Sequence, residues 1–137
     1  MKLRNESLLQ GILTTLRILE HQLKQQHINH LAIEWRYLIA LIQSAYLAVS
    51  EGEGIDKKAL VKTMRGITHK IDHEVVNIEA ELQGVQNYAS LSEDKLAEIK
   101  LKQELKKELQ KIIQLITESP ILTKHADLSD VVEMLRK

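Results

Sequence analysis

The stretch Leu60–Val85, LVKTMRGITHKIDHEVVNIEAELQGV, decides the fold. Its apolar residues recur at steps of three and four, the spacing of one face of a long α-helix and of a coiled-coil seam. We expect one helix over about residues 56–88, roughly 48 Å long at about 1.5 Å per residue. Because a compact globule of this chain length has a radius of gyration of only about 14 Å, the molecule is predicted to be elongated. The seam consists of Leu60, Met64, Ile67, Ile71, Val75, Ile78, Leu82 and Val85.

Other segments repeat the helical spacing of apolar residues on either side of this seam. Asn29, Asp56 and Ser90 are placed to cap the helices that follow them, since their side chains accept hydrogen bonds from free backbone N–H groups. Pro120 cannot continue a helix and ends the fourth one near residue 118. The further helices are expected over about residues 6–26, 30–50, 91–118 and 127–136.

Composition supports a wholly helical chain. Of 137 residues, 22 are Leu, 15 are Ile and 7 are Val, which is enough to build an apolar core. Five Gly and one Pro are too few for the frequent turns of a many-stranded sheet, so an all-β fold is excluded. The predicted fold is one all-α domain over residues 1–137. It is an elongated antiparallel four-helix bundle with a long central helix hairpin and a short fifth helix at the C-terminus.

The charge and the cysteine content of the chain limit the classes of partner and the cellular location that we expect. With 19 Lys and Arg against 19 Asp and Glu, the net charge is zero, so we do not expect nucleic acid as a partner. The absence of Cys fits a cytoplasmic location. The most apolar stretch, Tyr37–Val49, is shorter than the roughly 20 residues that span a bilayer. Residues Met1–Glu6 lack the pattern of a signal peptide, so we expect a cytoplasmic protein without a membrane span.

The sequence lacks the motifs of common catalytic sites. It contains no Gly-x-Ser-x-Gly elbow, no phosphate-binding Gly-rich loop and no Cys–His pair, so we expect no enzyme and no cofactor. His69 and His73 lie four residues apart on one predicted helix, a spacing that suits two ligands of a metal ion. They lie opposite the apolar seam, and the local sequence offers no third ligand. Histidines facing solvent or an interface are therefore the favoured interpretation.

The pentapeptide His21–Gln25, HQLKQ, carries a short resemblance to a known family. It resembles the His-x-Leu-Lys-Gly pattern around the phosphoacceptor of histidine phosphotransfer domains, which are themselves four-helix bundles. The resemblance implies that His21 accepts a phosphoryl group that it exchanges with a receiver domain. Gln25 stands where that family has a small residue, and His21 lies close to a helix end. A surface histidine is therefore the favoured interpretation.

The helix expected over residues 30–50 is apolar on two sides. At about 100° per residue, Leu31 and Trp35 share one side, and a second apolar set lies opposite. Ala40, Ser44 and Ala48 form a strip of small residues there, which suits the close approach of another helix. Either the first or the last helix of the bundle covers this strip, or a partner protein does. The candidate partner-binding residues of this side are Ile33, Tyr37, Ala40, Ser44, Leu47 and Ala48.

Charges are ordered along the two long helices. Residues 57–71 carry five basic residues and no acid, whereas residues 72–98 carry seven acids and one Lys. If these helices form an antiparallel hairpin, three lysines of the fourth helix come level with residues 68–73. An acidic tip and a basic belt are then expected, unless the blocks are ordinary solvated charges. The basic belt, which we consider a second candidate partner-binding surface, consists of Lys57, Lys58, Lys62, Arg65, Lys70, Lys106, Lys107 and Lys111.

Two classes of function are compatible with these patterns. The favoured class is a non-enzymatic protein-interaction module, such as an adaptor, a chaperone, an anti-factor or an immunity-type regulator. Such a module acts through a helical surface on a protein partner, and a homodimer is one form of that association. The alternative class is a histidine phosphotransfer-like or metal-binding helical bundle built on His21 or on His69 and His73.

Overall fold

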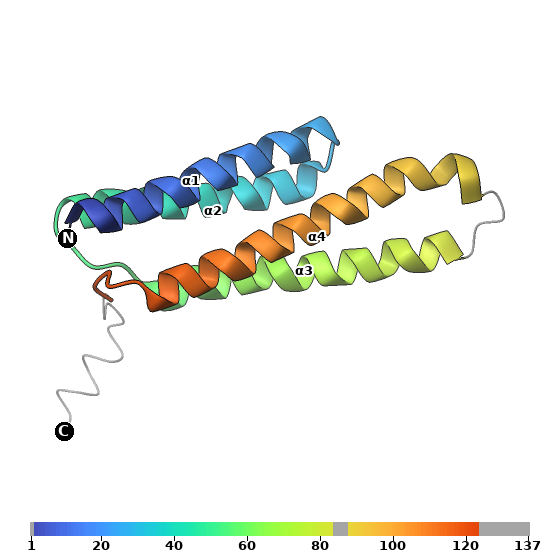
Figure 1. The fold of residues 1–137 in the computed structure, drawn as a ribbon. Helices are drawn as coiled ribbons and strands as arrows, with labels where there is room; N and C mark the ends of the chain where they lie inside the picture. The colour runs from blue at the N-terminus through green and yellow to red at the C-terminus, as the bar shows by residue number, and fades with distance from the viewer. Residues whose placement is uncertain (1, 84–87, 124–137) are drawn as a thin grey trace, which may run out of the picture.

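The computed structural model describes residues 2–83 and 88–123 and arranges them as four α-helices (Figure 1). Consecutive helices form two antiparallel hairpins, α1–α2 and α3–α4, which lie side by side. The predicted all-α four-helix arrangement with antiparallel neighbours is therefore confirmed. The expected fifth helix at 127–136 lies outside the described residues. The four helices are α1 (Lys2–Gln25), α2 (Asn29–Ser50), α3 (Lys57–Gln83) and α4 (Tyr88–Glu118).

One continuous apolar core joins the two hairpins. The predicted seam of α3 is buried from Leu60 to Ile78, and Ile71 is completely enclosed. Trp35 of α2 is also fully buried, and its indole N–H donates to the backbone carbonyl of Leu16 on α1 at 2.7 Å. This hydrogen bond satisfies the single polar atom of the side chain, so the ring can fill the core without an unpaired donor.

The turn between α1 and α2 differs from the one expected. Asn29 is the first residue of α2, and the buried Ile28 occupies the capping position without a side-chain hydrogen bond. Instead, α1 ends in a Schellman motif. His27 adopts a positive φ of 60°, while its N–H and that of Ile28 bond to carbonyls of the last turn of α1. Burial of Ile28 thus sets the turn, and the side chain of Asn29 is not needed as a cap.

The loop between α2 and α3 is tied to the chain that follows α4. Gly52 has a φ of 82° and follows the end of α2. Asp56 caps α3, as predicted, through a 3.0 Å bond from the N–H of Ala59 to its carboxylate. The Ile55 N–H donates to the Leu122 carbonyl at 2.8 Å. A Cβ added at Gly54 would lie 2.8 Å from that carbonyl oxygen, so the close approach requires glycine.

The boundaries of α3 and α4 deviate slightly from the expected ones. α3 begins at Lys57 and is described to Gln83, and residues 84–87 of the predicted 56–88 helix lie outside the described residues. α4 begins at Tyr88 instead of residue 91, so Ser90 is already helical and does not cap it. Differences of this size are usual at helix ends. In the described part of the chain, no helix combines the length and apolar character required to cross a membrane.

The enclosed position of Ile71 generates a stability prediction. We expect Ile71→Asp to unfold the protein, because an unpaired carboxylate in the core costs an amount comparable to a total stability of about 5–15 kcal/mol. The matched control is His69→Asp, which changes an exposed position of the same helix and should cost no more than about 1 kcal/mol. Circular dichroism and urea unfolding measure both variants. Equal midpoints for the two would contradict the assignment of the seam.

Candidate protein-interaction surface

The outer face of α2 is uncovered along most of its length. Ile33, Tyr37 and Leu47 expose 71%, 61% and 62% of their surface. Ala40 and Ser44 between them are exposed as well, whereas Ala48 is half-buried and packs against the core. Among the described residues, α1 therefore does not cover this side of α2. Five of the six predicted residues share one exposed face, and Ala48 lies at its edge.

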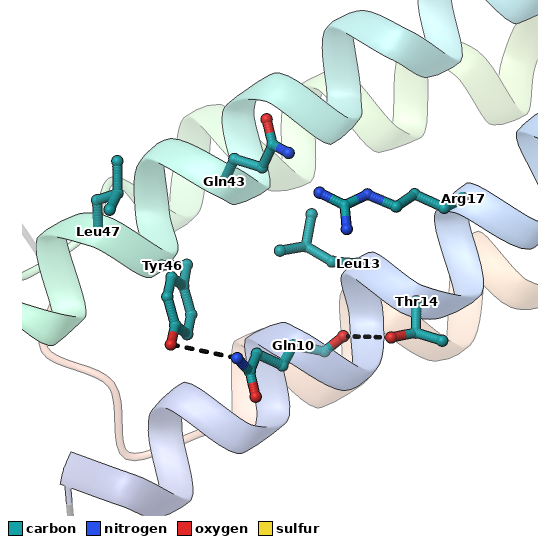
Figure 2. Close-up of a pocket in the computed structure, with 7 residues that line it drawn as sticks. All are labelled: Gln10, Leu13, Thr14, Arg17, Gln43, Tyr46 and Leu47. Carbon is teal, nitrogen blue, oxygen red and sulfur yellow. Dashed lines mark hydrogen bonds between the residues drawn. The ribbon is translucent and has the colours of Figure 1, made fainter.

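A hollow of about 500 Å³ lies between α1 and α2 beside this face (Figure 2). Tyr46 reaches from α2 towards α1, where its hydroxyl accepts a 3.2 Å hydrogen bond from the Gln10 side-chain amide. The apolar part of the lining of the hollow comes from Leu13, Tyr46 and Leu47, and Arg17 adds a positive charge. The hollow thus combines apolar surface with amide, hydroxyl and guanidinium groups that can form hydrogen bonds.

A second hollow, of about 490 Å³, continues the first towards the α1–α2 turn. Arg17 and Gln43 line both hollows. Lys24 of the second hollow pairs with Glu20 at 3.0 Å, whereas Arg17 and Arg36 form no ion pair within the described part of the chain. This end of the outer face is therefore cationic. Its lining consists of Arg17, Glu20, His21, Lys24, Arg36, Ile39, Ala40 and Gln43.

The basic belt is present at the expected register but is partly neutralised. Lys106 of α4 pairs with Asp72 of α3 at 2.6 Å. Lys106 therefore lies level with residues 68–73, as predicted for an antiparallel α3–α4 hairpin. Lys70 pairs with Glu34 at 2.8 Å, and Lys57 donates to the Ser119 carbonyl at 2.8 Å. The hydrogen bond from Lys70 to the Glu34 carboxylate raises the pKa of Lys70. The belt residues that remain exposed are Lys58, Lys62, Arg65, Lys70, Lys107 and Lys111.

The sequence did not reveal an ionic cluster where the two hairpins meet. Glu74 of α3 binds His30 of α2 through one carboxylate oxygen, and its other oxygen lies 3.9 Å from the ammonium of Lys102 on α4. Lys102 is only 3% exposed and also approaches Glu98 at 3.7 Å. The four-residue spacing of Glu98 and Lys102 is visible in the sequence, but such pairs usually lie in solvent. The burial of Lys102 is therefore a tertiary effect.

This cluster joins the two hairpins. It lies near the end of the α1–α2 hairpin, since His30 belongs to the first turn of α2. The second pair between the hairpins, Glu34 with Lys70, lies one turn further along α2. Both pairs join α2 to α3, in two neighbouring turns of α2, and therefore mark the register at which the two helices meet.

The histidines singled out in the sequence lie on the surface. His69 and His73 are both exposed, and the described residues contain no group of three or more His, Asp or Glu side chains that could hold a metal ion. His21 is exposed too, and it lines the cationic hollow together with Arg17, Lys24 and Arg36.

Comparison with known proteins adds no family to this description: no protein-family model, no curated protein and no solved structure matches the chain.

The buried cluster generates a prediction about stability. Glu74→Leu should destabilise the protein by about 2 kcal/mol, because it removes one of the two acidic partners of a buried Lys102. Lys102→Met in the same background should restore most of the loss, since an apolar chain of similar length replaces the unpaired charge. Urea unfolding of the single and double variants measures this coupling. Additive losses would show that Glu74 and Lys102 do not interact.

Proposed function

We propose that the protein is a non-enzymatic protein-interaction module that acts through the outer face of α2. The observation that carries this proposal is the exposure of Ile33, Tyr37 and Leu47 along one side of a helix whose other side is buried in the core. Large apolar residues gathered on one exposed face are typical of surfaces that bind other proteins. A tyrosine among them suits such a surface, because aromatic residues are enriched at interfaces.

The small residues between these side chains favour a helix as the binding partner. Ala40 and Ser44 leave the backbone of α2 open to close approach, while Tyr37 and Leu47 flank them. An amphipathic helix placed along this strip would bury apolar anchors at helical spacing. Adaptors, chaperones, anti-factors and immunity-type regulators use such contacts, and the protein is proposed to belong to this functional class. Its lack of Cys suits the reducing cytoplasm, where we place this activity.

The surroundings of His21 support a second candidate function. His21 lies in a hollow with Arg17, Lys24 and Arg36, and such cations attract phosphate groups. A phosphotransfer role would make His21 the acceptor. Incubation with a small phosphoryl donor, followed by mass spectrometry of the wild type and of His21→Gln, tests this alternative. Metal analysis of protein purified without an affinity tag tests the metal-binding alternative at His69 and His73.

The exposed strip generates a binding prediction. Ala40→Glu with Ser44→Arg should abolish association with a protein partner, because two charges would have to be buried at the contact. Both positions are exposed, so helicity and the unfolding midpoint should stay unchanged. The partner is recovered from the native host by cross-linking, purified, and titrated against both proteins by calorimetry. Equal affinity for the two proteins would contradict a binding role of the strip.

The basic belt generates a separate prediction about salt. Lys62, Arg65, Lys107 and Lys111 should increase the rate at which an acidic partner associates and have a smaller effect on its dissociation. Raising the salt from about 0.05 to about 0.5 M shortens the Debye length from roughly 14 to roughly 4 Å and should slow association. Stopped-flow kinetics of the wild type and of Lys62→Glu with Arg65→Glu measure this effect. An association rate that does not change with salt would contradict a role of the basic belt in binding and would show that its charges are only solvated.

A further inference from the structure

The two hairpins differ in length, and the longer one extends beyond the shorter. Figure 1 shows α3 and α4 continuing past the turn between α1 and α2. The ion pair of Glu74 with His30, in the first turn of α2, shows where the cover of α3 by α2 ends. The later residues of α3 and the earlier residues of α4 therefore extend beyond the α1–α2 layer as a two-helix arm, which borders the α1–α2 turn at Asp94 and Ala97. The molecule is therefore step-shaped: the α3–α4 hairpin projects past the end of the α1–α2 hairpin.

The uncovered side of this arm carries acidic residues together with Asn77 and Ala97. Lys70 and Glu74 face α2, and steps of three and four from Glu74 place Asn77 and Glu81 on the same face of α3, past the end of α2. On α4, Asp94 and Ala97 line a hollow together with the α1–α2 turn, so they face the same layer. We name Asn77, Glu81, Asp94 and Ala97 the shelf; all four are exposed.

The outer face of the α1–α2 hairpin is complementary to the shelf in charge. Near the turn, this face presents Arg17 and Arg36 without ion pairs in the described part of the chain, and it presents the exposed apolar side chains of Ile33 and Tyr37 beside them. The shelf contributes the carboxylates of Glu81 and Asp94. Opposite charges on surfaces of matching size favour their pairing and discriminate against other orientations.

We propose that two copies of the chain interlock as a two-fold symmetric dimer, in which the α1–α2 hairpin of each copy lies on the shelf of the other. This proposal rests on the proposed function, and it names a second copy as the occupant of the part of the face next to the α1–α2 turn. Turning one step-shaped molecule by 180° places its short layer above the arm of its partner. Both contacts are then identical, so the assembly closes at two copies and does not continue as a filament.

The contact area sets the expected strength of the dimer. Nine residues of α3, Val75–Gln83, span about 13 Å, and two helices of about 10 Å diameter make the shelf about 270 Å² in projection. The dimer has two such contacts, and each contact buries two faces of this size. The total buried area is therefore about 1,100 Å², near the lower limit for specific interfaces. We therefore expect a weak, reversible dimer that salt dissociates, since charge pairs at its rim are screened.

Charge exchange across the contact tests the proposal. Sedimentation equilibrium of the wild type at low salt should show a monomer–dimer equilibrium. Arg17→Glu with Arg36→Glu, or Glu81→Lys with Asp94→Lys, should each weaken dimerisation by about tenfold or more, because like charges then face each other. An equimolar mixture of the two double variants should dimerise again, since each contact then joins opposite charges. Arg4→Glu, which reverses an exposed charge at the other end of α1, is the control and should dimerise like the wild type.

The outcomes separate this inference from the function on which it rests. A wild type that stays monomeric, or a mixture of the double variants that does not dimerise, overturns the interlocked dimer. If the monomer still binds a purified partner and Ala40→Glu with Ser44→Arg abolishes that binding, the proposed function stands without the dimer. All substituted positions are exposed, and unchanged circular dichroism of each variant excludes loss of folding as the cause.

Discussion

The unequal length of the two helix hairpins is the constraint on which the rest of the molecule depends. An apolar seam remains buried only where a neighbouring helix covers it, and α2 ends its cover of α3 near Glu74. Beyond this boundary the seam stays buried to Ile78 against α4, and the contact between α2 and α3 ends in the ion pairs among His30, Glu74, Lys102 and Glu98. Such pairs bring little net stability, because desolvation offsets their attraction, but they mark the register at which the α1–α2 hairpin meets α3 and α4.

α2 is held in the core on one side and exposed on the other. Its inner side contributes the buried Trp35, whose indole is held by the carbonyl of Leu16, so the helix cannot rotate without losing that bond. Its outer side, with Ile33 and Tyr37, has no neighbour among the described helices. A helix held rigidly on one side presents the other side with little loss of entropy on binding, which favours a docking function.

The sequence predicted the helices well because burial of Ile71 and its neighbours follows directly from their spacing. The sequence also revealed that α2 has a second apolar side. Periodicity alone did not decide whether this side is buried in the core or lies on the surface. The burial of Lys102 could not be predicted from the sequence, because Glu and Lys four residues apart also occur on a helix face that lies in solvent. The α1–α2 turn was misjudged for a related reason: the burial of Ile28, a tertiary contact, replaced the local cap at Asn29.

Chemical accessibility of the outer face of α2 tests the central claim most directly. Because the chain contains no Cys, Ile33→Cys introduces a single thiol on the part of this face next to the α1–α2 turn, and Gln110→Cys introduces one on an exposed position of α4 as a reference. The measurement is the rate of maleimide labelling at low and high protein concentration. We expect the thiol at position 33 to become protected as concentration rises, while the thiol at position 110 keeps its rate. Equal rates at position 33 throughout would contradict the burial of this face by a second copy.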